Sequence, residues 1–134
     1  MLASLDRPLS AKVMWTRGPR VAFSEIELRR IEQDVGGLCK RRSPTHLKDE
    51  LSLQYRIKGH DVEVFERRPA WGGRGGQTET PVAKLKFVRT TGEWRLYWMR
   101  RDLKFHSYEM TLSRGDLPRL VKEIDEDPYG RFFG

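Results

Sequence analysis

At 134 residues, with 37% hydrophobic and 34% charged residues, the chain is long enough for one domain with a continuous core and too short for two. Leu, Val, Ile and aromatic residues are well represented, which excludes wholesale disorder. The net charge of +7 and the sequence pI near 9.9 favour an anionic partner, nucleic acid or an acidic protein, although the same charge also serves plain solubility.

Cys39 is the only cysteine, which excludes an intramolecular disulfide and a cysteine-rich zinc site. No run approaches the roughly 20 apolar residues that span a bilayer. Charged residues and Pro8 interrupt the N-terminal stretch where a secretion signal would need an apolar core. The sequence therefore predicts a cytoplasmic protein that does not insert into membranes, and we expect no cofactor and no bound metal.

Residues 1–21 mix prolines, a glycine and scattered charges without a sustained period. We expect a flexible N-terminal arm or an upstream extension of the translated start there. A single α+β domain is predicted over residues 22–134.

The first predicted element is a helix from Glu25 to Lys40. Ser24 and Glu27 have the spacing of a capping box, and apolar residues follow at helical intervals. The basic residues 40–42 suit the negative end of the helix dipole as a charged C-cap, and a phosphate site is the alternative.

From Leu51 onward the hydrophobic period changes from helical to two, which predicts a β-hairpin. Gly59 and His60 supply a two-residue turn. That turn fixes a register in which three pairs lie opposite each other: Ile57 with Val62, Tyr55 with Val64, and Leu53 with Glu66.

This register places the Glu66 carboxylate on the apolar face of the hairpin, near its end. Burying a charge is costly unless the charge is paired. Either Glu66 finds a basic partner such as Arg68 at the rim of the core, or it forms one wall of a functional pocket.

The stretch from Pro69 to Pro81 is rich in glycine and predicts a flexible connection. A nucleotide-binding loop is the alternative, but no capped helix follows with the spacing of a phosphate-binding motif.

Three further strands are predicted at Val82–Arg89, Glu93–Arg100 and Leu103–Glu109, with tight turns between them. A final helix begins after Asp116, which can cap it, and stops before Pro128. The fold class is therefore α+β: a five-stranded antiparallel β-meander with an N-terminal and a C-terminal helix packed on one face.

The aromatic tail ends in Phe132 and Phe133. Exposing both rings would leave a sticky terminus, so we expect at least one of them to be buried.

Two-residue turns would place basic and aromatic side chains together on the sheet face away from the helices. Such a mixture suits single-stranded nucleic acid, because cations neutralise phosphates and rings stack on bases. The alternative is a solvated sheet face or a plain interaction module. One continuous positive face would favour nucleic-acid binding, whereas acidic neighbours among the lysines would favour the alternative. The candidate binding residues are Lys84, Lys86, Arg95, Tyr97, Lys104, His106 and Tyr108.

The sequence also allows the hypothesis of an enzyme. It would be a small phosphodiester hydrolase with a catalytic centre of carboxylates and histidine near the junction of the first helix and the first strand. Its candidates are His46, Asp49 and Glu66, which would have to converge on one cleft. The sequence shows neither a metal-ligand spacing of the HExxH kind nor a serine in a nucleophile elbow.

Five runs resemble a known family: FSEIELRRIE, RRSPTHLKDELSLQYRI, FERRP, PVAKLKFVRTTGEWRLYWMRRDLKFHSYE and DEDPYGRFFG. The family is an uncharacterised bacterial one, domain of unknown function 3024, and the resemblance covers about residues 22–134. It implies a shared fold and a bacterial, cytoplasmic setting. It carries over no catalytic or binding residue, because the family has no assigned activity.

Overall fold

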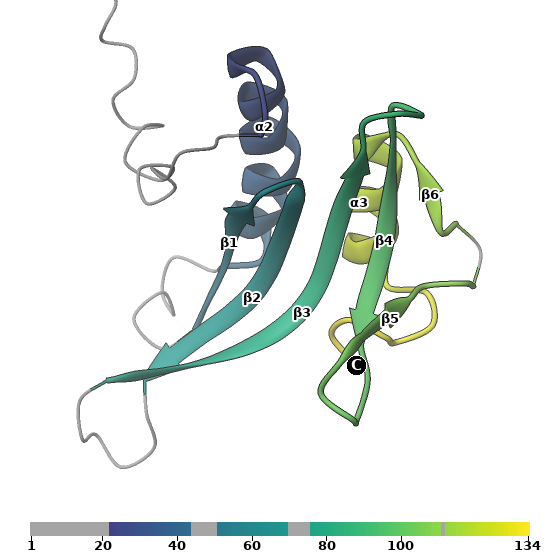
Figure 1. Ribbon diagram of the computed structural model, residues 1–134. Helices are drawn as coiled ribbons and strands as arrows, with labels where there is room; N and C mark the ends of the chain where they lie inside the picture. The colour runs from purple at the N-terminus through teal and green to yellow at the C-terminus, as the bar shows by residue number, and fades with distance from the viewer. Residues whose placement is uncertain (1–21, 44–50, 70–75, 111) are drawn as a thin grey trace, which may run out of the picture.

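The computed structural model describes residues 22–43, 51–69, 76–110 and 112–134. In chain order the elements are a helix, six strands and a second helix. The strands form one antiparallel sheet in the order β1-β2-β3-β4-β5, and β6 pairs with β4. The predicted α+β meander with a helix at each end is confirmed (Figure 1).

Helix α2 spans Glu25–Arg41 and begins where its capping box predicts. The amide of Glu27 donates to Ser24 Oγ at 3.2 Å, and the amide of Ser24 donates to Glu27 Oε1 at 2.9 Å. Both bonds satisfy donors at a helix start that have no partner within the helix. One side of the helix is buried through Ile31, Val35, Gly36, Leu38 and Cys39.

Strands β1 (Ser52–Lys58) and β2 (Asp61–Pro69) form the predicted hairpin. Gly59 has a φ of 59°, a left-handed conformation that glycine adopts without strain. The three predicted pairs, Ile57 with Val62, Tyr55 with Val64 and Leu53 with Glu66, are all confirmed.

Strand β3 (Gln77–Val88) is the longest of the described strands. It pairs with β2 along Gln77–Lys86 and with β4 along Ala83–Val88, so its Ala83–Lys86 segment lies between both neighbours. The prediction of a loop up to Pro81 is wrong, because Gln77–Pro81 pair with Phe65–Pro69. These residues of β3 are exposed, so backbone pairing rather than a buried face holds them. A bulge leaves Val82 without a partner in β2, which bends the strand.

The register between β4 (Glu93–Met99) and β5 (Phe105–Ser107) differs from the predicted one. A two-residue turn after β4 would place Trp98 opposite Phe105, but Trp98 lies opposite His106. The connection is longer than a two-residue turn, and Leu103 in it has a φ of 63°. A shift of one residue moves every side chain of β5 to the other face of the sheet.

Strand β6 (Arg114–Gly115) was not predicted, and it pairs with Trp94 and Arg95 of β4. Helix α3 (Leu117–Glu126) follows at once. Its N-cap is Asp116, as predicted, and the Asp116 carboxylate accepts a bond from the amide of Arg119 at 3.2 Å.

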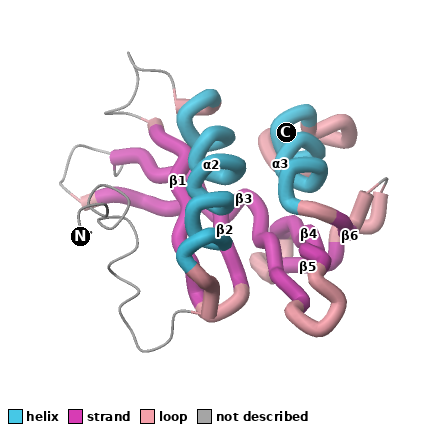
Figure 2. Tube along the Cα trace, turned by 90° about the horizontal axis from the view of Figure 1, so that it is seen from above, coloured by secondary structure: helices cyan, strands magenta, loops and turns pink. Residues whose placement is uncertain are grey.

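Both helices cover the same face of the sheet. The buried residues of α2 and α3 belong to one core cluster with Leu53, Val62, Leu85 and Leu96, whose side chains share that face. Figure 2 shows α2 beside β1 and α3 beside β4, with β3 passing between the two groups. The apolar side of the meander is therefore buried, and its polar side is left open.

Two arginines at the C-terminal end of α2 join it to α3. Arg41 Nε and Arg42 Nε each lie 3.1 Å from a different oxygen of the Asp125 carboxylate. Arg42 is the C-cap residue of α2, and its guanidinium also lies 3.7 Å from the ring centroid of Phe133. Arg41 and Arg42 therefore connect the two helices, and Arg42 also contacts the C-terminal tail. These contacts come in addition to the predicted position of the basic residues at the helix end.

The C-terminal tail packs on the body, as predicted. Phe132 is buried, with its ring centroid 5.1 Å from that of Tyr108. The amides of Phe132 and Phe133 donate to the Asp127 carboxylate at 3.0 and 2.8 Å.

None of the helices in the described ranges is both long enough and apolar enough to cross a membrane.

Removing residues 129–134 is expected to lower the melting temperature by several degrees, because burying one aromatic side chain contributes about 1.5–3 kcal/mol. Phe132→Ala should reproduce most of this loss in a differential scanning experiment. Ile26→Ala is the control, since Ile26 is 63% exposed. Equal melting temperatures for the truncated and full chains would contradict the packing of the tail.

Candidate functional site

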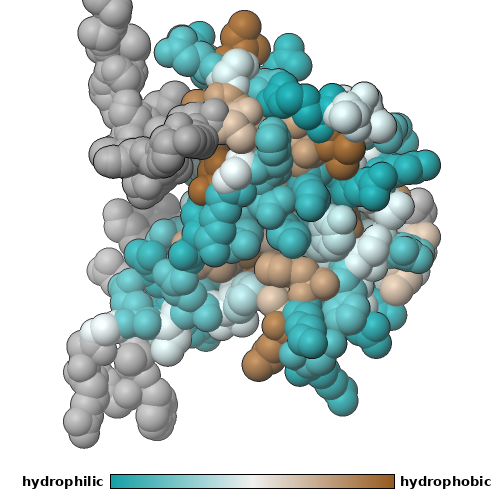
Figure 3. Space-filling view, viewed as in Figure 1, coloured by the Kyte–Doolittle hydropathy of each residue, from teal (hydrophilic) through white to brown (hydrophobic). Residues whose placement is uncertain are grey.

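The open face is the side of the sheet that points away from the helices. In the view where β3 and β4 lie in front of α3, Figure 3 shows a mainly hydrophilic surface with a small hydrophobic area near its middle. The pairing of the strands places these residues on the open face: Gln54, Arg56, Lys58, Asp61, Glu63, Phe65, Arg67, Glu79, Pro81, Lys84, Lys86, Glu93, Arg95, Tyr97, Met99, Phe105, Ser107 and Arg114.

The open face is curved. A hollow of about 180 Å³ is lined both by Phe65 of β2 and by Phe105 of β5, although β3 and β4 lie between these strands. Residues so far apart in the sheet can line one small hollow only if the sheet bends toward them. The bulge at Val82 supplies such a bend.

On β1, β2 and the first part of β3 most charges of the open face form ion pairs. Arg56 and Arg67 both bind the Glu79 carboxylate, and the Arg67 contact is 3.1 Å long. Lys58 Nζ lies 3.7 Å from Glu63 Oε1. The hydrogen bond from Arg56, together with that from Arg67, holds the pKa of Glu79 below its ordinary value. This half of the face is therefore not the continuous positive surface that a nucleic-acid module alone would predict.

The two arginines also enclose an aromatic ring. The guanidinium carbons of Arg56 and Arg67 lie 4.1 and 5.7 Å from the ring centroid of Phe65. Their Nε atoms are buried without a hydrogen-bond partner in the part of the chain that the structure describes. Phe65 is buried on the open face because these side chains cover it.

The other half of the open face carries a row of three cations, which we call the basic row: Lys86, Arg95 and Arg114. Lys86 lies directly opposite Arg95 across β3 and β4, and Arg95 lies directly opposite Arg114 across β4 and β6. None of the three forms an ion pair with a described carboxylate, although Asp61 is the cross-strand neighbour of Lys86. Like charges directly opposite each other destabilise a sheet.

An aromatic cluster adjoins the basic row. Lys84 Nζ lies 5.0 Å from the ring centroid of Tyr97 and 5.2 Å from that of Phe105. Tyr97 is two residues along β4 from Arg95, on the same face. Both rings are partly exposed, so this patch offers planar apolar surface next to fixed positive charge.

Of the seven predicted binding residues, Lys84, Lys86, Arg95 and Tyr97 lie on the open face as predicted. The placement of Lys104, His106 and Tyr108 there is wrong, because of the register of β5. His106 lies opposite Trp98 and binds Asp102 at 2.8 Å, and the carbonyl of Lys104 accepts from the amide of Arg100. Tyr108 is fully buried, and its hydroxyl donates to Glu123 at 2.5 Å.

The predicted catalytic residues do not form a described site. His46 and Asp49 lie outside the described residues. Glu66 lies on the helix-covered face of β2 and pairs with Arg68 at 3.2 Å, which is the rim partner that the sequence suggested. Within the described ranges no three or more His, Cys, Asp or Glu side chains are grouped so that they could hold a metal ion.

The sequence did not reveal two members of the site, Arg114 and Phe105. Arg114 belongs to a strand of two residues, which is too short to show alternation. Phe105 was assigned to the buried face by the shorter turn. Asp102 is a sequence signal for the longer turn. Its carboxylate accepts a hydrogen bond from the amide of Lys104 at 3.0 Å, and aspartate often starts a turn through such a local bond.

Together, the meander, the two helices on one face and the charged open face define a small α+β protein with a curved sheet. The chain belongs to the family described as Domain of unknown function (DUF3024), whose sequence profile matches residues 23–134. The family resemblance seen in the sequence is thereby confirmed. No curated protein and no solved structure matches the chain.

Replacing Glu79 by Gln is expected to lower stability by up to about 1 kcal/mol, since the pair is partly exposed. The lowered pKa of Glu79 means that its contribution is present above its ordinary value of 4.5 and is lost as the pH falls through the folded-state pKa. Urea unfolding of the two proteins should therefore differ at pH 7 and converge in acid. Glu93→Gln is the control on the same face, and a pH-independent difference for Glu79→Gln would refute the assignment.

Proposed function

We propose that the chain is a binding module for single-stranded nucleic acid that contacts phosphates through the basic row on its open face. The observation that supports this proposal is the pairing of Lys86 with Arg95 and of Arg95 with Arg114 in adjacent strands. Such a row costs stability in the free protein. A bound polyanion removes that cost, because each phosphate neutralises a cation and releases counterions.

The aromatic cluster favours nucleic acid over an acidic protein surface. Tyr97 and Phe105 lie next to the basic row and are partly exposed. Stacking of a base on an aromatic ring contributes about 1–3 kcal/mol and tolerates any sequence. Bases splayed from a single strand can reach these rings, whereas the bases of a duplex are stacked on each other and cannot.

The rest of the open face defines the limits of the contact. Arg56 and Arg67 are engaged by Glu79, and Lys58 by Glu63. The proposed interface is therefore a short segment over β3, β4 and β6 rather than the whole sheet. A cytoplasmic setting, which a chain with one cysteine suits, belongs to the same proposal.

A phosphodiester hydrolase is the other function that the sequence suggested. The described residues offer no observation in its favour, because Glu66 is the one candidate among them and it is paired with Arg68. We therefore put forward binding without catalysis.

The proposal predicts that a fluorescent oligo(dT) of about 20 nucleotides binds at about 50 mM salt and dissociates steeply as salt rises. Fluorescence anisotropy should show a weaker affinity for Lys86→Gln, Arg95→Gln and Arg114→Gln. Each substitution should reduce the slope of log K against log salt by about 0.7, the value for one lost contact to a single strand.

Arg29→Gln is the matched control, because it removes the same charge from the exposed surface of α2. It should leave affinity nearly unchanged. An equal loss from Arg29→Gln would show that binding depends on net charge alone. No binding of the wild-type chain to single strands at low salt would reject the proposed function, and binding of acidic proteins would then be the alternative to examine.

A further inference from the structure

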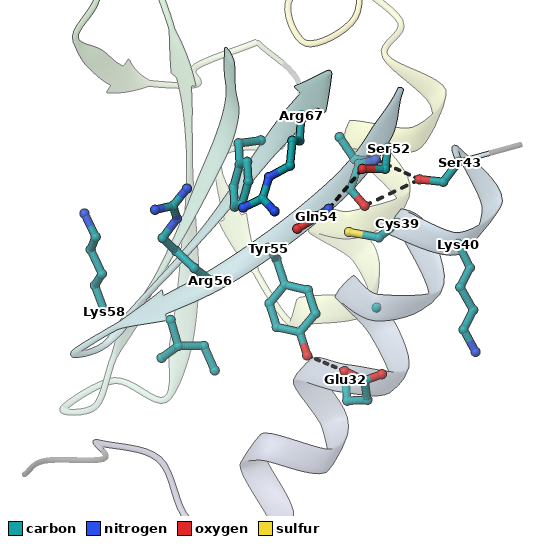
Figure 4. A pocket seen from close by; sticks show the side chains of 14 residues that line it. Glu32, Cys39, Lys40, Ser43, Ser52, Gln54, Tyr55, Arg56, Lys58 and Arg67 are labelled. Atoms are coloured by element: carbon teal, nitrogen blue, oxygen red, sulfur yellow. Dashed lines mark hydrogen bonds between the residues drawn. The ribbon is translucent and has the colours of Figure 1, made fainter. Parts of the chain in front are cut away.

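A second surface lies along β1, which is the outermost of the described strands. A hollow of about 800 Å³ follows β1 and is lined by every residue of that strand, Ser52–Lys58. Residues of α2 form one wall, and Phe65 and Arg67 of β2 belong to the other. Figure 4 shows β1 running between Glu32, Cys39 and Lys40 on the helix and Arg56 and Lys58 on the open-face side.

The backbone of β1 presents hydrogen-bonding groups to this hollow. Among the described strands β1 pairs with β2 alone. The amide of Leu53 donates to Ser43 Oγ at 2.7 Å, so the backbone of Leu53 points away from β2. In an antiparallel strand this direction recurs at every second residue, which turns the amides and carbonyls of Tyr55 and Ile57 to the same side. These are the groups that an added strand would bind.

One residue of the helix wall is a glycine. Gly36 lines the hollow, and a Cβ atom at this position would lie 3.1 Å from the Glu32 side chain. Glu32 is itself held by the hydroxyl of Tyr55, which donates to its carboxylate. A glycine inside a helix costs about 1 kcal/mol relative to alanine. Gly36 is buried, and the Glu32 side chain lies where a Cβ atom would project, so a glycine here lets Glu32 reach Tyr55 of β1.

The two sides of the hollow differ in chemistry. Toward α2 the lining combines apolar surface of Leu53, Tyr55, Ile57 and Cys39 with the carboxylate of Glu32 and the hydroxyl of Ser43. Toward the open face the lining carries the guanidinium groups of Arg56 and Arg67 and the ammonium group of Lys58, of which Glu79 and Glu63 neutralise a part. Lys40 adds a further cation at the helix end.

We propose that this hollow binds an extended segment of a partner protein, which adds to β1 as a further strand. Alternate side chains of an added strand point to opposite faces of the sheet. One set would enter the apolar side below α2, and the other would meet the cations of the open-face side. The segment that fits therefore alternates apolar and acidic residues.

Charge decides between this occupant and the chain itself. Residues 1–21 contain Arg7, Lys12, Arg17 and Arg20 and one carboxylate, that of Asp6. A second copy would bring Arg56 and Lys58 of its own β1 against the same cations. The cations that line the hollow would repel residues 1–21 and a second copy of β1, but they would attract an acidic segment.

The test uses the full chain and a peptide as long as β1 in which glutamate and valine alternate. Anisotropy should show binding that weakens with salt. Amide exchange followed by NMR should show that the amides of Tyr55 and Ile57 exchange quickly in the free chain and become protected when the peptide binds. Replacing glutamate by lysine in the peptide should weaken binding about tenfold or more without any change to the protein.

Two N-methylated peptides separate strand addition from other modes of binding. Methyl groups on one alternate set of amides should abolish binding, because those amides face β1, and methyl groups on the other set should have little effect. Equal effects of the two sets would overturn the proposal. Protection of Tyr55 and Ile57 in the free chain would also overturn it, because the chain itself, or a second copy, would then cover the edge.

Protein variants keep this site apart from the proposed nucleic-acid surface. Lys40→Glu should weaken peptide binding and leave oligo(dT) binding unchanged, and Arg95→Glu should do the reverse. Loss of peptide binding in both variants would assign it to net charge and reject the edge site. Peptide binding can fail while oligo(dT) binding persists, so the two proposals stand or fall separately.

Discussion

Burial of one sheet face by both helices is the constraint on which the rest of the structure depends. The core-facing side chains of β1 to β4 join the apolar sides of α2 and α3 in a single cluster. Helix α2 lies beside β1 and α3 beside β4, and β3 passes between the two groups. The bulge at Val82 bends β3 next to Ala83–Lys86, the segment that pairs with both β2 and β4. The polar side chains of the sheet then lie mainly on the open face.

The elements that sequence reasoning located correctly are those with strong local signals. The capping box of Ser24 and Glu27 and the cap Asp116 are bonds between residues three apart, so the sequence contains the whole interaction. The β1-β2 register follows from Gly59 in a two-residue turn and from strict alternation on both strands. The same alternation placed Lys84, Lys86, Arg95 and Tyr97 on the open face.

The elements that it misplaced lack such signals. Gln77–Pro81 are exposed on both sides, so their pairing leaves no hydrophobic pattern in the sequence. The turn before β5 depends on a left-handed backbone at Leu103, which a residue with a side chain rarely adopts. Arg114 joins the basic row through a strand of two residues, and only the fold brings it beside Arg95.

The order of the strands in space follows their order in the chain from β1 to β5, and this has a consequence for folding kinetics. Each strand meets a neighbour that is close in sequence, so closing each hairpin costs little loop entropy. The hairpins can therefore form before distant segments meet. The bonds from Arg89 to Glu27 and from Arg42 to Asp125 join residues far apart in the chain. Closing these long loops costs more chain entropy than closing a hairpin, so we expect these two contacts to form after the hairpins.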